Sequence, residues 1–153
     1  MDKREETLNQ LEENYGGGKD NVLILSTVAL ETTADGKPRP AVREVDAIYE
    51  DGAFYITTYG KSNKIMQIEQ NDSVAFAFHF GDYSGNGIGK NLGWVMKPEN
   101  AALRVKLRKA FADWYDAANN DQSEDCVILA IKITSVHVFR DHGAVNYTVD
   151  FAE

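Results

Sequence analysis

Cationic and hydroxyl side chains gather in one short stretch of this otherwise acidic chain. Lys61, Ser62 and Lys64 directly follow an apolar segment that ends near Thr58. Arg43 belongs to the extended segment before it. Ser62 stands where it would cap a short helix, and the first amides and the dipole of a helix attract an anion. Cations, hydroxyls and a helix start are together typical of a phosphate-binding site.

A β-hairpin would bring Arg43 to the other residues of this group. Asp51-Gly52 is a strong signal for a two-residue turn between two extended segments, Arg39–Glu50 and Ala53–Tyr59. Because a two-residue turn fixes the register, it predicts three pairs: Glu50 with Ala53, Val45 with Thr58, and Arg43 with Gly60. This register places Arg43 at the end of an apolar ribbon face, close to the start of a helix over Ser62–Gln70.

An ordinary surface explains part of the same pattern. An arginine at the end of a strand can be exposed to solvent, and a serine at the start of a helix needs only its capping role. On spacing alone, both interpretations of Arg43 and Ser62 are open. What favours the phosphate site is the local reversal of sign in a chain whose net charge is −8.

The composition limits the classes of protein and partner. The chain has 153 residues, the length of one domain, and its 43% hydrophobic and 26% charged residues are ordinary for a globular protein. With 24 acidic against 16 basic residues, it is a poor partner for nucleic acid or an anionic membrane. No signal peptide or membrane-spanning run is visible, and the single Cys126 favours a reducing compartment, so we expect a cytoplasmic protein.

The first residues are expected to stand apart from the main domain. Residues 2–15 have the pattern of a short polar helix with a thin apolar stripe, Leu8 and Leu11. Three glycines, residues 16–18, give the backbone too much freedom to continue a helix and predict a hinge. We therefore expect an appended helix and hinge over residues 1–18 and one domain over residues 19–153.

Strands dominate the rest of the expected structure. Apolar runs predict strands at Asn21–Leu30, Arg39–Glu50, Ala53–Tyr59, Val74–Phe80, Leu92–Met96, Cys126–Arg140 and Val145–Phe151. The glycine-rich residues 81–89 are expected to form a flexible loop. One long helix is predicted from Pro98, with an apolar face of Leu103, Leu107, Ala110, Phe111 and Trp114. Because most strands are joined by hairpins, an antiparallel sheet or small barrel is favoured.

Other motifs point to no catalytic residue. The three histidines and Cys126 lack the spacing of a metal site, so no metal is expected. Residues 81–90 fail the pattern of a nucleotide-binding P-loop, and no Gly-x-Ser-x-Gly elbow exists for a serine hydrolase. Cys126 opens an apolar strand, which is typical of an inert core residue. The catalytic residues, if any, stay unknown at this point.

Part of the chain resembles a known family. The run Arg43-Glu-Val, the segment Asp51-Gly-Ala-Phe-Tyr-Ile-Thr-Thr-Tyr-Gly-Lys-Ser-Asn-Lys64 and the run Asn71-Asp-Ser-Val-Ala resemble the pyridoxamine-phosphate-oxidase-like flavoproteins. The resemblance spans roughly residues 21–151. It implies a mainly β fold, an antiparallel split β-barrel with flanking helices, and a homodimer with FMN in a cleft between the subunits.

The resemblance also assigns site residues by position. Arg43, Ser62 and Lys64 would hold the FMN phosphate, and Thr57 and Thr58 would line the cofactor. Lys61 is not part of the family pattern; we add it for its charge and its location. Asn63 stands where the family often has an arginine, and Lys61 would replace that missing cation.

The C-terminal residues separate this chain from the vitamin oxidases of the family. Residues 146–153 lack the tryptophan and paired arginines that true pyridoxamine phosphate oxidases use on their substrate. The general stress protein-like branch is the closer resemblance. It implies an FMN-dependent oxidoreductase acting on a small-molecule substrate or a nicotinamide donor. The alternatives are a non-catalytic flavin-binding or storage protein, or a protein of the same fold that binds a deazaflavin or haem.

Overall fold

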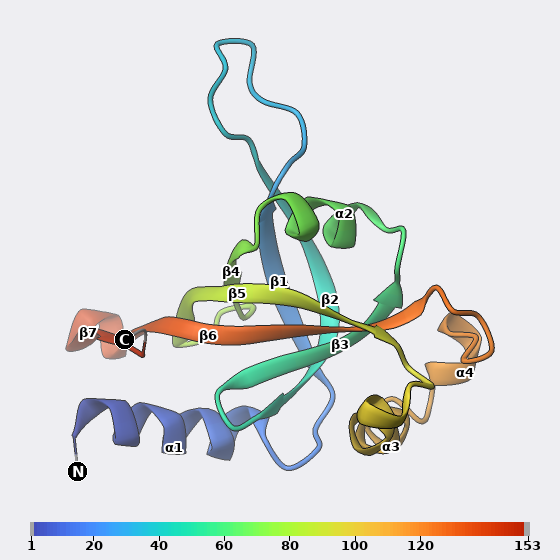
Figure 1. The fold of residues 1–153 in the computed structure, drawn as a ribbon. Coiled ribbons are helices and arrows are strands. Elements are labelled where there is room, and N and C mark those ends of the chain that lie inside the picture. Colours follow the sequence, from blue (N-terminus) through green and yellow to red (C-terminus); the bar gives the residue numbers. More distant parts are fainter. Residues whose placement is uncertain (1, 152–153) are drawn as a thin grey trace.

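The computed structural model describes residues 2–151, and within them an antiparallel sheet curves into a barrel (Figure 1). The strand order is β3-β2-β1-β4-β5-β6-β7, and an additional pairing of β3 with β6 closes six strands into a ring. β7 pairs with β6 outside this ring. The strands are β1 (Asn21–Val28), β2 (Pro40–Glu50), β3 (Ala53–Tyr59), β4 (Ser73–Ala77), β5 (Tyr83–Trp94), β6 (Cys126–Arg140) and β7 (Val145–Asp150). The expected split β-barrel architecture is thus confirmed.

The register of the β2–β3 hairpin is confirmed only next to its turn. Glu50 pairs with Ala53, and the ladder continues to Ile48 with Tyr55. The expected pairs of Val45 with Thr58 and of Arg43 with Gly60 are wrong, because the strands diverge after this point. β3 pairs along its whole length with β6, while β2 follows β1 as far as its Pro40 end. Each strand satisfies its backbone groups on another neighbour, which opens the ribbon and closes the barrel.

The glycine-rich loop expected over residues 81–89 is wrong, because most of this segment belongs to strand β5. The glycines lie where the neighbouring backbone leaves no space for a side chain. A Cβ atom on Gly85 would overlap the carbonyl oxygen of Ser135, and one on Gly87 would lie 2.7 Å from that of Lys132. The ladder with β6 shifts its register between Asn86 and Gly87. Glycine here permits a bulge and close strand packing rather than flexibility.

The single long helix expected from Pro98 is broken into three pieces. A 3-10 turn, η1 (Pro98–Asn100), leads into α3 (Ala101–Ala110), and a turn separates α3 from α4 (Tyr115–Ala118). The break lets the rings of Phe111 and Trp114 stack with their centroids 4.6 Å apart. These helices cover one outer side of β3 and β6 through a second apolar cluster: Ile48, Val95, Leu107, Phe111, Tyr115, Cys126 and Ile128.

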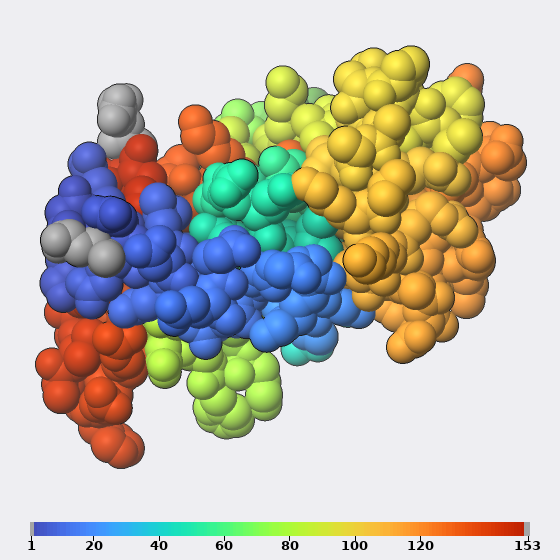
Figure 2. All heavy atoms as spheres, turned by 90° about the horizontal axis from the view of Figure 1, so that it is seen from below, coloured from blue at the N-terminus to red at the C-terminus, as the bar shows by residue number. Residues whose placement is uncertain are grey.

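Two other helices close the ends of the barrel. α1 (Lys3–Tyr15) buries Leu11 completely in the main apolar cluster and stacks Tyr15 on Phe78, with ring centroids 3.8 Å apart. Seen from below in Figure 2, the teal start of β3 lies between the blue N-terminal segment and the gold and orange segment of α3 and α4. α2 (Asn63–Gln70) covers the opposite end and buries Ile65 and Ile68. No helix within residues 2–151 is both long and apolar enough to cross a membrane.

Candidate functional site

Two cationic side chains come together where α2 covers the barrel. Arg43 extends from β2, and Lys64 belongs to the first turn of α2. Burial lowers the pKa of both groups, and the positive charge of Arg43 lowers the pKa of Lys64 further. Within residues 2–151, neither side chain has a carboxylate within ion-pair distance. A bound anion would stabilise the charged forms of these two neighbouring, half-buried groups, which lack an acidic partner.

Neutral acceptors orient the guanidinium group of Arg43. Its Nη1 donates to the hydroxyl of Thr27 at 2.7 Å and to the carbonyl of Leu25 at 3.3 Å. Its Nη2 donates to Oε1 of Gln67 at 2.9 Å. Thr27 and Gln67 are also hydrogen-bonded to each other and are almost fully buried. Neither residue belongs to a recognised motif; the only signal in the sequence that marks them is a polar residue on an otherwise apolar strand or helix face. Because these acceptors carry no charge, they hold Arg43 in place and leave its positive charge uncompensated.

Two hydroxyl-bearing residues, Thr58 and Ser62, precede Lys64 in the chain. Its ammonium group donates to the hydroxyl of Thr58 at 2.7 Å, and Thr58 is buried. Ser62 occupies the N-cap position of α2, but its hydroxyl does not cap the helix. The Ser62 hydroxyl is buried and has no hydrogen-bond partner among the described residues. A buried hydroxyl without a partner, two residues before Lys64 at the start of α2, is a group that a phosphate oxygen could satisfy.

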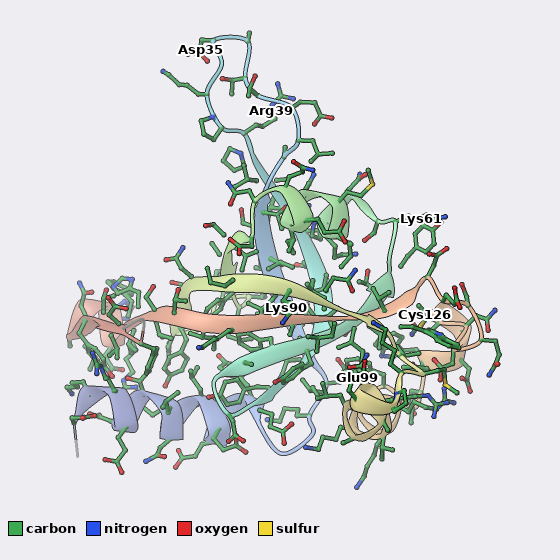
Figure 3. All side chains as sticks on the ribbon, viewed as in Figure 1. Asp35, Arg39, Lys61, Lys90, Glu99 and Cys126 are labelled. Carbon is green, nitrogen blue, oxygen red and sulfur yellow. The ribbon has the colours of Figure 1, made fainter. Side chains whose placement is uncertain are left out.

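Two of the expected site residues lie apart from this group. Thr57 pairs with Ile128 of the second apolar cluster, so it points to the outer side of β3 and away from Thr58. Lys61 is exposed, and its ammonium group lies 3.6 Å from a carboxylate oxygen of Asp125. In Figure 3 the labelled Lys61 projects away from the barrel. The contacts thus join Lys64 to Thr58 and to the charge of Arg43, with Ser62 two residues away at the start of α2, whereas Thr57 and Lys61 point elsewhere.

Replacing Thr57 with valine tests whether this residue serves binding or only packing. The Thr57 hydroxyl is buried without a partner in residues 2–151, and such a group costs free energy in the folded state. Thr57→Val should therefore raise the free energy of unfolding by about 1 kcal/mol, measured by urea denaturation. Thr58→Val is the matched control and should lower stability, because it leaves Lys64 without its acceptor. Loss of FMN affinity in Thr57→Val would instead return this residue to the site.

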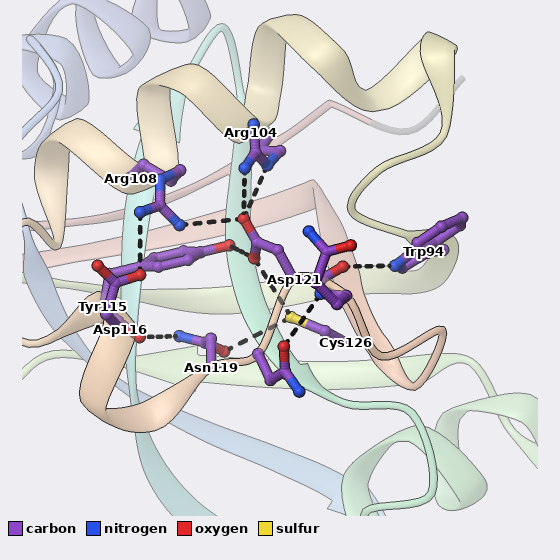
Figure 4. Close-up of polar contacts among 10 residues, drawn as sticks. Trp94, Arg104, Arg108, Tyr115, Asp116, Asn119, Asp121 and Cys126 are labelled. Carbon is purple, nitrogen blue, oxygen red and sulfur yellow. Dashed lines mark hydrogen bonds and ion pairs between the residues drawn. The ribbon is translucent and has the colours of Figure 1, made fainter.

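A second polar cluster surrounds Asp121, in the loop between α4 and β6 (Figure 4). Its buried carboxylate accepts hydrogen bonds from Arg104 at 2.8 Å, Arg108 at 3.0 Å and the Tyr115 hydroxyl at 2.6 Å. Burial alone would raise the pKa of Asp121, but the hydrogen bonds from Tyr115 and Arg104, with the charges of both arginines, hold it below its usual value. All of these groups satisfy one another, which indicates a structural role.

Cys126 lies beside this cluster and is almost fully buried. Burial and the neighbouring carboxylate of Asp121 raise the pKa of its thiol to about 11. The thiol is therefore protonated at neutral pH, which makes it a poor nucleophile. The burial agrees with the sequence-based prediction of an inert core cysteine.

Solved structures of other proteins share this fold at low sequence identity. General stress protein 26 from Bacillus anthracis matches 97% of this chain and 98% of its own, with a TM-score of 0.64 and 18% identity. A protein from Clostridium acetobutylicum related to general stress protein 26, of the pyridoxinephosphate oxidase family, matches 99% and 97%, with a TM-score of 0.64 and 14% identity. The haem storage protein of Vibrio cholerae matches 88% and 93%, with a TM-score of 0.63 and 12% identity.

The proteins of this fold differ in what they bind. Besides the haem storage protein, they include a FAD-binding protein from Mesorhizobium loti and an F420 reductase. No family model and no curated protein matches the chain in sequence. At these identities the comparisons establish the fold: the chain has the split barrel of the pyridoxamine-phosphate-oxidase-like proteins.

Proposed function

We propose that this chain is an FMN-binding redox protein whose Arg43, Thr58, Ser62 and Lys64 form the phosphate site. The observation that carries the proposal is the pairing of two half-buried cations, free of carboxylates among the described residues, with the orphaned hydroxyl of Ser62. The wider chain has a net charge of −8, so this positive group is a local exception. A FAD-binding protein from Mesorhizobium loti has the same fold, which supports a flavin as the ligand.

Each residue has a distinct task in this proposal. Arg43, held from behind by Thr27 and Gln67, would present its remaining N–H groups to two phosphate oxygens. Lys64 would add a second positive charge, the Ser62 hydroxyl would donate a hydrogen bond to the phosphate, and Thr58 would keep Lys64 in position. Bound FMN would supply the hydride or electron transfer, so the chain itself need only bind and orient the cofactor.

A homodimer with the cofactor between the subunits belongs to the same proposal. The outer face of β1 and β2 carries two markedly exposed valines, Val22 and Val42, at 52% and 68% exposure. Val22 lies opposite Asp46 and Val42 opposite Ser26, so both valines point to the same side of the sheet. Exposed apolar side chains on one sheet face are typical of a surface that another subunit covers. In solution we expect a mass of twice the 17.0 kDa chain.

The absorbance spectrum of the purified protein tests the cofactor, and mass analysis of the released ligand identifies it. We expect a flavin band, FMN in the released fraction, and bleaching of the band by NADH or NADPH under anaerobic conditions. A flavin band that neither donor bleaches would support the alternative of a flavin-binding or storage protein. A haem or deazaflavin spectrum would support the corresponding alternative, which the ligands of other split-barrel proteins favour. A colourless protein that does not take up added FMN would contradict the proposal.

A further inference from the structure

A cavity of about 390 Å³ lies between α1 and the outer side of the barrel, away from the proposed phosphate site. Its volume is within the range of small-molecule sites. It lies where the N-terminal segment meets the start of β3. Its lining comes from α1, the β2–β3 turn, β3, β6 and the end of the chain: Leu8, Asp51, Gly52, Ala53, Tyr55, Ala130, Lys132, Ile133 and Phe151.

Two alanines create the flat floor of this cavity. Ala53 of β3 pairs with Lys132 of β6, and Tyr55 pairs with Ala130. Paired residues of antiparallel strands point to the same face, so the two alanines alternate with the two long side chains. The small methyl groups leave a shallow, flat space between the Tyr55 ring and the Lys132 stem. Such a floor suits a planar apolar group better than a branched one.

The walls of the cavity are held firmly in place. Leu8 contributes the wall on the α1 side, and α1 is anchored by the buried Leu11 and by a hydrogen bond of 3.2 Å between the Thr7 and Tyr147 hydroxyls. Phe151 contributes an aromatic wall, and the amide of this residue donates to the carbonyl of Thr134 at 2.7 Å. The cavity is therefore a preformed feature of the packed fold.

Two residues of the lining, the exposed Lys132 and the half-buried Tyr55, carry hydrogen-bond donors without partners among the described residues. The Lys132 ammonium group has no acidic group within ion-pair distance in residues 2–151, and the Tyr55 hydroxyl makes no hydrogen bond there. Burial and the charges of Glu50 and Asp51 raise the pKa of Tyr55, which keeps its hydroxyl protonated. The Asp51 carboxylate also lines the cavity and repels anions, so one negative charge placed on Lys132 is tolerated better than two. Together these groups suit a ligand with one anionic group.

We propose that this cavity binds a planar, apolar monocarboxylate, with its ring on Ala53 and Ala130 and its carboxylate on Lys132 and Tyr55. This cavity is separate from the proposed phosphate site. Ala53 and Thr58 are five residues apart along β3, about 16 Å, and their side chains point to opposite faces of the strand. Binding here therefore does not depend on whether the chain holds FMN.

Calorimetric titration of the full chain with 2-naphthoate tests the proposal, with 2-naphthamide as the uncharged analogue. We expect 2-naphthoate to bind more tightly than 2-naphthamide. Lys132→Gln should weaken 2-naphthoate by about tenfold or more and leave 2-naphthamide within about twofold. The matched control is Lys97→Gln, which removes an exposed charge in the segment after β5 that does not line the cavity, and it should change neither affinity.

Ala130→Leu provides an independent steric test. The larger side chain fills the floor, so both probes should lose binding while FMN affinity is unchanged. The far-ultraviolet circular dichroism spectrum of Ala130→Leu shows whether this variant folds. If it does not fold, the affinities of Lys132→Gln for the two probes alone test the proposal. Absence of 2-naphthoate binding, or binding that Lys132→Gln leaves unchanged, overturns the proposal. Failure to bind FMN, by contrast, would leave the result at this cavity valid.

Discussion

Replacing Lys64 with alanine should weaken FMN binding by about tenfold to a hundredfold. The change removes a charge-assisted contact worth about 1.5–3 kcal/mol. The loss is expected to be this large because Lys64 is half-buried and no carboxylate of the described residues competes for its ammonium group. Flavin fluorescence quenching on titration with the chain freed of its ligand measures the dissociation constant. Arg43→Ala should cause a similar loss, but it also disturbs Thr27 and Gln67, so Lys64→Ala is the cleaner variant.

Lys61→Ala is the matched control for this measurement. It removes the same charge only three residues away, but Lys61 is exposed and pairs with Asp125 at 3.6 Å. An exposed pair of this kind contributes little, so FMN affinity should stay within about threefold of the wild type. Equal losses in the two variants would show that the total positive charge matters and that the proposed site is wrong.

The pH dependence of FMN affinity gives a second readout of Lys64. In the free protein, burial and then the charge of Arg43 hold the pKa of Lys64 below its ordinary value, and a bound phosphate dianion would raise it. The affinity should therefore be full below the pKa of the free protein and fall as the pH rises through it. This alkaline decline should begin below the ordinary lysine pKa of about 10.4 and should be absent from Lys64→Ala.

Local signals in the sequence predict the parts of the fold that are built from neighbouring residues. The Asp51-Gly52 turn correctly gives the pairing of Glu50 with Ala53, because a tight turn constrains the residues that flank it. It fails by Thr58, because the path of β3 is decided there by β6, more than sixty residues later in the chain. Long-range pairing of this kind leaves no local pattern.

The same contrast explains the errors at glycines and in the helical region. Gly85 and Gly87 have the composition of a loop, but they serve a close approach between β5 and β6 that only the assembled sheet reveals. The apolar spacing from Leu103 to Trp114 fits one helix, yet the chain turns after Ala110. The turn accompanies the burial of Tyr115 and its contact with Asp121, which a one-dimensional pattern does not contain.

The approach of Arg43 to the start of α2 could be anticipated from the sequence, but the residues that hold Arg43 in place could not. Arg43, Ser62 and Lys64 were identified from residue type and spacing, and the structure brings them to the same end of the barrel. Thr27 and Gln67 were missed because their role depends on β1, β2 and α2 meeting at one point. Thr57 was assigned by position from the family resemblance, and its side chain points to the face of β3 opposite to that of Thr58.

The Asp121 cluster is the place where one substitution should most reduce stability. The carboxylate joins α3, through Arg104 and Arg108, to Tyr115 at the start of α4. The indole of Trp94 also donates to the backbone carbonyl of Asp121 at 2.8 Å. Only about 8% of Asp121 is exposed, so water cannot replace the carboxylate once it is removed.

Asp121→Ala should therefore lower the free energy of unfolding by about 3 kcal/mol, near the lower end for a broken buried ion pair because both arginines are partly exposed. This corresponds to a fall in Tm of about 6–12 °C. Asp116→Ala is the matched control: Asp116 binds the same Arg108 at 2.9 Å but is 82% exposed, and its loss should cost less than about 1 kcal/mol.

Because the pKa of Asp121 is depressed in the folded state, the contribution of Asp121 to the free energy of unfolding is complete above the unfolded pKa of about 3.9 and is lost as the pH falls through the folded pKa. The difference in the free energy of unfolding between the wild type and Asp121→Ala should accordingly become smaller in acid. Equal losses of stability in Asp121→Ala and Asp116→Ala at neutral pH would refute the structural role of the cluster.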